Sequence, residues 1–597
     1  MGIFFKSSMI TPSEVLAGDS VEFVIRLEAG EDYIFDKPSM IAFEFGAPLG
    51  TSCPTRDVNE CSGYVEAYCS SPIVTWEIKI WDFDFKYFID NNNKASREAA
   101  RMVVLEMSPG IKPGDIIELH WGETLGGFGP GTKVTTVVPK KGWSAYVDIR
   151  YFDNNVLEPD MGRDFEGYTR PVPKSIKRLR YKVIPREVSK FRLFRKISTS
   201  TLVPYDKFWN IADVKNLPDL IVSSSKGIKN KQGTFDFKDK NVRITCKNHP
   251  IMETPPMENA FQGMNIYWGD LHTHSKFSCD CEQRSGMDMS PEDLMDFARY
   301  RAMLDFFAVT DHHVPHFGAD RLLGEEKWNA TMNGIREKHE EGKFVIIPGF
   351  EFTDDYGDIC LYFKELYPYL QISLFEAKNV SDFYSIFGDN MLAVAHLHSP
   401  GIRKFGEWRE GINPISPVIE LYSDHGSFEH PHVCENGRAN YRVLREDRCA
   451  SYFIKQGCRY GFAANSDDHK GHAGINGLTA VFAENLSREA IWDAYCKRRV
   501  YATTNARIRL LFTGNQQLMG SEIKDWTRKE LHIDVCGEES LKKVELFRNG
   551  NFHEMFIPSG KNFKTDYICN TSEPDSWYVR VTQMNNHIAW SSPVWFY

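Results

Sequence analysis

Three features are missing from this chain of 597 residues, and each absence excludes a class of protein. No apolar run approaches the length of about 20 residues that spans a bilayer, so we expect no membrane partner. The N-terminus lacks a basic start followed by a long apolar core and a cleavage site, so no secretory leader is expected. Basic residues are not in excess, because the chain has 71 Lys and Arg and 81 Asp and Glu. The formal charge is therefore −10. That balance argues against a nucleic-acid partner, since phosphate backbones need clustered cations.

Cysteine usage also lacks a pattern. The thirteen cysteines are an odd number without regular spacing, and no Cys-x-x-Cys zinc knuckle occurs. Such thiols favour a reducing compartment, and we therefore expect a cytoplasmic protein. The hydrophobic content of 42% and charged content of 25% are ordinary for a globular protein.

What the sequence does contain is a series of short apolar runs that end in metal-ligand residues. These residues are His272, His274 and Asp280 after 266–268; Asp311 and His312 after 306–309; Glu351 after 344–347; His396 and His398 after 391–395; His425 after 418–422; and Asp467 and His469 after 460–464. Histidine and carboxylate together are the ligands that Zn, Mn or Fe ions prefer. The number of candidate ligands exceeds what one tetrahedral ion needs, so we expect two or three divalent metal ions per chain.

The spacing within two of these groups has a physical reason. On an extended segment, residues i and i+2 point the same way, so His272 and His274 can hold one ion together, as can Asp467 and His469. Strand-then-ligand units separated by helical stretches predict an α/β fold with a parallel sheet, and barrels of that type carry function at the C-terminal strand ends. Ser290-Pro291 predicts the start of one such helix, and 487–497 another.

The chain divides into four predicted parts. Residues 1–160 resemble an immunoglobulin-like β-sandwich, 161–258 are a β-rich segment with a linker, 259–509 hold the ligands, and 510–597 form a C-terminal β-sandwich. In the last part, Asn549-Gly550 predicts a hairpin turn. The tryptophans at 577, 590 and 595 are interpreted as core residues rather than as a platform for sugars.

Five of the motifs resemble those of the PHP (polymerase and histidinol phosphatase) superfamily, in the family's order. They are His272-Thr273-His274, Thr310-Asp311-His312, Gly349-Phe350-Glu351, Ala395-His396 and Ser466-Asp467-Asp468-His469. The resemblance covers 265–509, and the flanking regions are similar to a bacterial branch of unknown function with β-sandwich domains. It implies a distorted (β/α)7 barrel of the TIM-like kind, holding up to three metals.

The resemblance also implies which ligands share an ion. The first ion would take His272, His274, Glu351 and Asp467. Glu351 would bridge to a second ion held by His396 and His425, with His396 favoured over His398. The third would take Asp280, His312 and His469, although several phosphatases of the family have a histidine where Asp280 stands.

A metal-activated hydroxide would make the chain a hydrolase, and a phosphoesterase acting on a phosphomonoester or phosphodiester is favoured. The expected catalytic residues are His312, Glu351 and His469, with Asp311 orienting its neighbours. Lys276, Arg403 and Lys470 are candidates for binding an anionic small-molecule substrate. Two alternatives stay open, namely a hydrolase of a carboxylic ester, amide or lactone, and a non-catalytic protein that binds sugar or metal.

Overall fold

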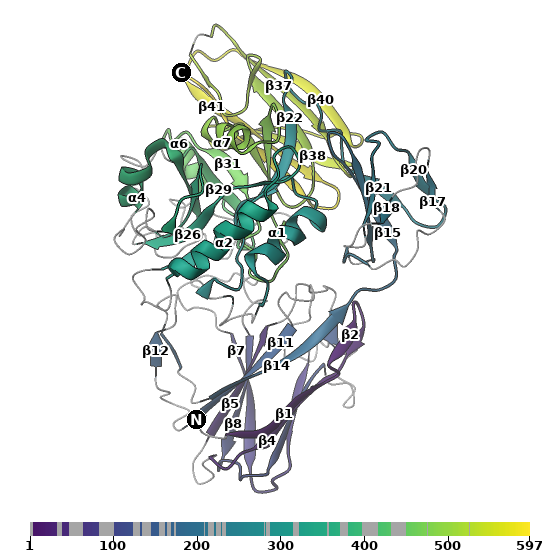
Figure 1. Cartoon of the computed structure of the whole chain (residues 1–597), viewed down its shortest axis with the longest axis vertical. Helices are drawn as coiled ribbons and strands as arrows, with labels where there is room; N and C mark the ends of the chain where they lie inside the picture. Colours follow the sequence, from purple (N-terminus) through teal and green to yellow (C-terminus); the bar gives the residue numbers. More distant parts are fainter. Residues whose placement is uncertain are drawn as a thin grey trace. The chain divides into compact units, whose positions relative to one another are not determined.

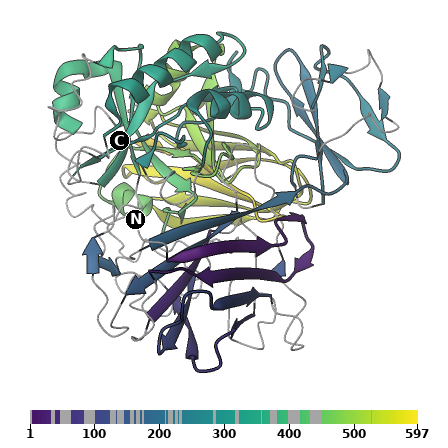
Figure 2. The same cartoon turned by 60° about the horizontal axis from the view of Figure 1, so that its bottom comes forward.

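The structure is a computed structural model of the whole chain (Figures 1 and 2). It describes all residues except 1–3, 33–38, 47–63, 83–100, 123–131, 134–144, 154–160, 164–168, 172–174, 208, 213–219, 223–227, 230–233, 280, 282–286, 315–321, 355–356, 370–379, 397–415, 431–448, 475 and 525. No helix among the described residues has the length and apolar character needed to cross a membrane.

The chain forms two compact units. The first comprises Met1–Val188, Tyr205–Asp213 and Arg284–Gly286, and the second comprises Ser189–Pro204, Val214–Gln283 and Met287–Tyr597. Every described candidate ligand lies in the second unit. The finer division at residues 160, 258 and 509 stays a prediction.

The first unit contains a β-sandwich. One sheet has the order β1 (Phe5–Thr11), β4 (Phe23–Ala29), β9 (Ile116–Trp121) and β6 (Val65–Cys69). The other has the order β2 (Glu14–Leu16), β14 (Ser175–Ile184), β11 (Ala145–Asp153), β5 (Ser39–Gly46), β8 (Arg101–Ser108) and β7 (Thr75–Asp82). Two short pairs accompany them, β3 (Ser20–Val21) with β10 (Thr132–Lys133) and β12 (Met161–Arg163) with β13 (Thr169–Pro171). Alternate residues of β4, Phe23, Ile25 and Leu27, are buried in one core shared by the two sheets, as in a strand with one face against a core.

In the second unit, the candidate ligands lie on the strands of a seven-stranded sheet and on loops that follow strands of this sheet and of an eleven-stranded one. The eleven-stranded sheet has the order β25 (Val345–Ile346), β23 (Phe306–Phe307), β22 (Asn265–Asp270), β32 (Leu478–Ala483), β33 (Val500–Thr503), β42 (Ile588–Ser591), β41 (Asp575–Gln583), β38 (Leu541–Arg548) and β39 (Asn551–Phe556), with β43 (Val594–Phe596) beside β41 and β36 (Glu522–Ile523) beside β43. The seven-stranded sheet has the order β24 (His312–His313), β26 (Gly349–Asp354), β27 (Gly357–Phe363), β28 (Met391–His396), β29 (Val418–Ser423) and β30 (Gly426–Ser427), with β31 (Gly461–Ala464) beside β29.

Smaller sheets complete this unit. A four-stranded sheet has the order β35 (Gln517–Leu518), β34 (Arg509–Gly514), β37 (Lys529–Cys536) and β40 (Asn562–Cys569). A five-stranded sheet has the order β18 (Ile228–Lys229), β19 (Phe235–Phe237), β16 (Ser200–Tyr205), β15 (Lys190–Arg195) and β21 (Ile251–Glu253), and β17 (Leu220–Val222) pairs with β20 (Ile244–Cys246). Partly buried ion pairs connect the five-stranded sheet to the rest of the unit, because Arg192 pairs with Glu538 and Lys196 Nζ lies 3.1 Å from Asp305 Oδ1.

The described helices are α1 (Pro291–Tyr300), α2 (Gly324–Lys338), α4 (Val380–Phe387), α6 (Ala450–Lys455) and α7 (Arg488–Cys496), with a 3-10 turn at Gly388–Asn390. Two of them, α1 and α7, begin where the sequence predicts, and the other three were not predicted. Ser290 caps α1 in a capping box with Asp293, and the Ser487 side chain accepts from the amide of Ala490 at the start of α7. Helices α1 and α2 lie side by side (Figure 1).

The predicted (β/α)7 barrel is wrong. Strands make up 48% of the structure and helices 13%, a proportion that does not fit seven strand–helix units. Parallel pairs do occur, as between β24 and β26 and between β28 and β29. Antiparallel neighbours interrupt them, because β27 lies between β26 and β28 and β32 pairs with β22. The sequence pattern predicted the strands that precede the ligands, such as β22 and β28, but not β27 and β32, which lie antiparallel to their neighbours.

The C-terminal strands continue the eleven-stranded sheet, in which β22 leads into the loop with His272 and His274. Strand β33 pairs with both β32 and β42, so the sheet runs from β22 to the end of the chain without a break. Trp577, Trp590 and Trp595 are buried in it, which confirms their interpretation as core residues. Asn549 and Gly550 both have positive φ in the turn between β38 and β39, as predicted.

Candidate metal centre

Eight of the nine predicted ligands are described, and all eight lie in one cluster in the second unit. Four groups of ligand atoms can be distinguished, each with its atoms within 4.8 Å of one another: His274, His312 and His469; His272, His274, Glu351 and Asp467; His272, His396 and Glu420; and His396, His425 and Asp467. The ninth predicted ligand, Asp280, lies outside the described residues, as do His398 and Arg403.

Asp467 occupies the middle of the cluster. Its Oδ1 lies 3.3 Å from His272 Nε2 and 3.1 Å from His274 Nε2. Its Oδ2 lies 2.9 Å from His396 Nε2 and 3.0 Å from His425 Nε2. Each oxygen therefore faces a different pair of histidines. The residue has φ of 49°, a left-handed conformation that few side chains other than Gly, Asn and Asp adopt readily.

Glu351 is the second central carboxylate. Its Oε2 lies 3.3 Å from Nε2 of both His272 and His274 and 3.0 Å from His312 Nδ1. The resemblance assigned Glu351 as a bridge toward His396 and His425. In the described residues, Asp467 takes that position, and Glu351 faces the His312 side instead.

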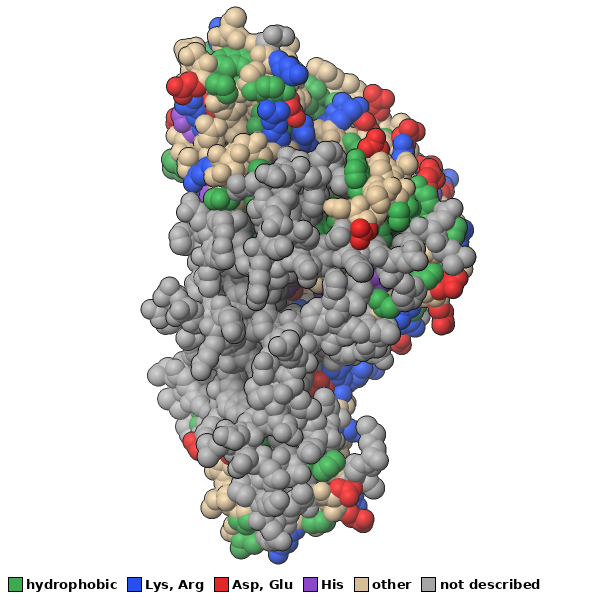
Figure 3. Space-filling view, turned by 90° about the vertical axis from the view of Figure 1, so that its left-hand side faces the viewer, with side chains coloured by type: hydrophobic (Ala, Val, Ile, Leu, Met, Phe, Trp, Pro, Cys, Tyr) green, Lys and Arg blue, Asp and Glu red, His purple; other side chains and the backbone are tan. Residues whose placement is uncertain are grey.

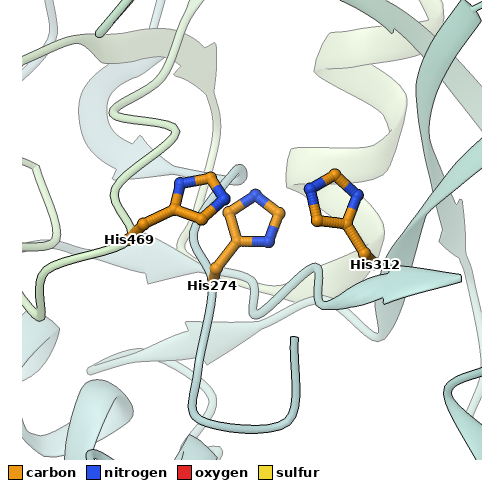
Figure 4. A group of neighbouring side chains, drawn as sticks. All are labelled: His274, His312 and His469. Carbon is orange, nitrogen blue, oxygen red and sulfur yellow. The ribbon is translucent and has the colours of Figure 1, made fainter. Parts of the chain in front are cut away.

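Three histidines, His274, His312 and His469, form the first of the four groups, drawn in Figure 4. The rings of His274 and His469 are stacked with centroids 3.9 Å apart, and those of His274 and His312 are 4.6 Å apart. His312 comes from β24, while His274 and His469 come from the loops after β22 and β31 (Figure 4). The backbone holds those loops together, because the amide of His274 donates to the carbonyl oxygen of Asp468 over 3.0 Å.

The electrostatics of the cluster favour bound cations. Side chains of Glu351, Glu420 and Asp467 are at most 3% exposed, and no Lys or Arg among the described residues pairs with them. Burial, the largest single effect, opposes ionisation, but the neighbouring histidines hold the pKa of Asp467 and Glu351 well below the usual range. Burial also opposes the charged form of His396, yet Glu420 and Asp467 raise its pKa to about 9. Three buried carboxylates thus require positive charge, which divalent ions can supply in place of protons.

Two buried atoms test whether a metal would fit. His272 Nε2 and Glu351 Oε2 form no hydrogen bond within the described part of the chain, although both are shielded from solvent. Buried polar atoms nearly always have a hydrogen-bond partner, so such atoms need an explanation. Both atoms point into the same group of candidate ligands, and a metal ion bound there would satisfy both.

The remaining predicted residues have other contacts. Asp311 accepts from the amide and the hydroxyl of Ser275, both over 2.6 Å, so its carboxylate holds the loop after His274 rather than a histidine ring. Burial raises the pKa of Asp311 to about 6. Lys276 is exposed and lies 3.5 Å from Asp288, and Lys470 is half-buried on the loop after His469.

Sequence reasoning missed one member of the cluster. Glu420 lies in the middle of β29, where every residue is buried, and it contacts His272 and His396. An acidic residue inside an otherwise apolar strand was a usable signal, because buried carboxylates are rare unless they are paired.

Comparisons with known proteins assign no function to the cluster. Residues 447–534 match a family described as "Protein of unknown function (DUF3604)". An uncharacterized protein of Chlamydia pneumoniae is 25% identical over 404 residues, which cover 61% of this chain and 62% of that protein. An uncharacterized protein of Chlamydia trachomatis is 23% identical over 397 residues, covering 59% of this chain and 61% of that protein. The chain thus spans about three fifths of the length of these curated relatives.

Solved structures resemble the chain only distantly. A Bacteroides uniformis β-glucuronidase aligns with 97% of this chain and 74% of its own, at 9% identity and a TM-score of 0.15. A putative β-galactosidase from Bacteroides fragilis aligns with 99% of this chain and 93% of its own, at 9% identity and a TM-score of 0.16. Scores this low carry no argument about fold or activity.

The predicted membership of the PHP superfamily is wrong on these findings. No PHP family matches the chain, and the matching family is one of unknown function. The strand-rich structure agrees with this correction.

Proposed function

We propose that the protein is a metal-dependent hydrolase, and specifically a phosphoesterase for a phosphomonoester or phosphodiester. The observation that carries the proposal is the position of Asp467, whose two oxygens face two different pairs of histidines. A carboxylate in that position could bind two neighbouring ions, one through each of its oxygens. Divalent ions such as Zn, Mn or Fe, bound there, would lower the pKa of a bound water to about 7 and neutralise the oxygens of a phosphoryl group.

The exposure of the histidines supports one side for the approach of a substrate. His272 and His274 are fully buried, whereas the side chains of His312, His425 and His469 are 12%, 20% and 22% exposed. The half-buried histidines therefore mark the open side of the cluster. His312 and His469 would contact the substrate or exchange protons with it, and Glu351 and Asp467 would hold the buried face.

Charge outside the cluster is mixed rather than of one sign. On the face shown in Figure 3, basic and acidic side chains are interspersed over its described part. This fits a small anionic substrate bound at a local positive centre better than a nucleic acid bound along a basic surface. We also propose that the protein works in the cytoplasm.

The test is hydrolysis by the full chain after loading with Zn, Mn or Fe. A panel of phosphomonoesters and phosphodiesters is compared with aryl carboxylic esters, amides and lactones. Phosphate release that depends on metal supports the proposal. Turnover of the carboxylic substrates alone would assign the chain to another hydrolase class, and metal binding without turnover of either set would indicate a non-catalytic protein.

A further inference from the structure

A pocket lies in the C-terminal part of the second unit, close to the end of the chain that is marked in Figure 1. Its volume is about 420 Å³, and its walls come from the segments that follow β36 and β40 and from Tyr597 after β43. None of the lining residues is a candidate metal ligand. Sites for small molecules have volumes of about 300–1,000 Å³, so the pocket is large enough to hold a ligand of its own.

The buried charges behind one wall are positive in excess. The Asp575 side chain is fully buried, and its two oxygens lie 2.8 Å from Lys529 Nζ and 2.8 Å from Arg548 Nε. The hydroxyl of Thr571, which lines the pocket, accepts from these two cations over 3.1 and 3.2 Å. Because two cations contact a single carboxylate, this group keeps a net positive charge next to the pocket.

The same excess occurs beside Tyr597. Its hydroxyl donates to Glu522 Oε2 over 2.7 Å. Glu522 in turn pairs with two arginines, Arg459 over 2.5 Å and Arg498 over 2.6 Å. A single carboxylate again contacts two cations, so both sides of the pocket attract negative charge.

Some polar side chains of the pocket wall are not used elsewhere. Lys524, Asn570 and Ser572 are exposed, and their side chains form no hydrogen bond or ion pair within the described part of the chain. Lys524 Nζ lies 5.8 Å from the centre of the Tyr597 ring, so its charge adds to that of the walls. Glu573, exposed on the loop after β40, offsets only part of this charge. A ligand can therefore find one ammonium, one amide and one hydroxyl group ready to bind it.

Two partly buried aromatic side chains complete the wall. Lys529 Nζ lies 4.3 Å from the centre of the Trp526 ring, and Arg459 Cζ lies 4.1 Å from that of the Tyr597 ring. These cation–π contacts hold the rings in place. Aromatic surface suits the C–H face of a sugar ring, and polar groups spread around the wall suit several hydroxyls better than a flat base.

We propose that this pocket binds a monosaccharide unit that carries a phosphate or a carboxylate group. Lys524 binds the anionic group, and the sugar ring packs against Trp526 and Tyr597. Asn570 and Ser572 form hydrogen bonds with the sugar hydroxyls. Because the pocket shares no residue with the metal cluster, binding requires no metal, and the proposal does not depend on the chain being a hydrolase.

The experiment is isothermal titration calorimetry of the full chain after metal has been removed with a chelator, with circular dichroism to verify the fold. If the chelated chain does not fold, the metal-loaded Glu351→Gln variant takes its place. The probes are glucose 6-phosphate, galacturonate, glucose, inorganic phosphate and adenosine monophosphate. We expect one or both anionic sugars to bind about 10-fold more tightly than the other three probes, since only they offer both a charge and a sugar ring of matching size. The two anionic sugars distinguish a phosphate from a carboxylate ligand.

Two variants locate the binding. Lys524→Glu reverses the charge of an exposed side chain and should weaken binding of the anionic sugar about 10-fold or more. Lys542→Glu is the matched control, because Lys542 is an exposed lysine of β38 that does not line the pocket, and it should bind as wild type does. The proposal is overturned if no anionic sugar binds at millimolar concentration or if the two variants behave alike. Binding of glucose, inorganic phosphate or adenosine monophosphate as tight as that of the anionic sugars would equally overturn it.

Discussion

The amide of Asp467 donates to the carbonyl oxygen of His272 over 2.8 Å, so the loops after β22 and β31 are joined by the backbone at the point where both present ligand side chains. Asp270 adds to this junction, since it accepts from the amides of Ser466 and Gly474 over 3.0 and 2.7 Å. Burial raises the pKa of Asp270 to about 7. Two ligand-bearing loops are therefore positioned by main-chain contacts that do not depend on the ligands themselves.

Replacing Asp467 by Asn should remove activity without disturbing the backbone. Asparagine tolerates the left-handed conformation of this position, so the loop is retained, but the charge facing four histidines is lost. We expect metal-dependent turnover to fall more than about 100-fold, with a lower metal content. Asp468→Asn is the matched control, because Asp468 accepts from the amides of Lys470 and His472 and not from a ring. Equal metal content in the two variants would contradict the central position of Asp467.

Glu351→Gln should abolish turnover while leaving the fold intact. Its Oε2 faces three histidines, and a neutral amide cannot provide the negative charge that metal binding there requires. Circular dichroism should be unchanged, and phosphate release should fall to background. Turnover close to that of wild type would show that Glu351 is not part of the reacting centre.

Removing metal should lower stability as well as activity. An ion present at 100 times its Kd stabilises the folded state by about 2.7 kcal/mol, so two ions contribute about twice that. Treatment with a chelator followed by thermal unfolding should therefore show a lower midpoint, and addition of Zn, Mn or Fe should restore both the midpoint and turnover. Identical unfolding curves before and after chelation would mean that the buried carboxylates are balanced in some other way.

Glu429 should make stability depend on acidic pH. It is buried, and it accepts from Arg580, Trp590 and Tyr578 over 2.7 to 2.8 Å. Burial opposes its ionisation, but Arg580 holds its pKa well below the usual value of 4.5. Because the folded-state pKa is depressed, the stabilisation is complete above about pH 4.5 and is lost as pH falls through the folded-state pKa. Glu429→Gln should cost about 3 kcal/mol at neutral pH, and the difference from wild type in denaturant unfolding should shrink in acid.

Deleting the C-terminal strands should destroy the centre rather than release a separate module. Strand β42 pairs with β33 of the ligand-bearing sheet, and Trp590 contacts both Glu429 and the ring of Tyr422, next to the loop that carries His425. A chain ending at Arg509 should be insoluble or bind less metal than the full chain. Soluble, fully metal-loaded protein from that fragment would show that the two regions fold independently.

Some of these features could be predicted from the sequence, and the reasons are local. His272 and His274 follow an apolar strand at a spacing of two, and Ser290-Pro291 has the chemistry of a helix start, so neighbouring residues carry the information. The direction of the strands could not be predicted, because whether β27 pairs parallel or antiparallel with β26 depends on distant packing and not on its own composition.

The role of Glu420 shows the same limit. His272 and Glu420 are 148 positions apart, and nothing in the apolar sequence of β29 shows which side chain its one carboxylate meets. Asp311 was expected to orient a histidine, but Ser275 lies closer and offers two donors. Contacts between residues that are remote in the chain become visible only once the sheets are assembled.

The ligands of the centre are also widely separated along the chain, with His274 and Asp467 lying 193 positions apart. Support for the His425 loop is equally remote in sequence, because Trp590 of β42 (Ile588–Ser591) lies 161 positions beyond its partner Glu429. All of these segments must therefore be in place before the cluster can form, so partly folded chains should hold less metal than fully folded ones.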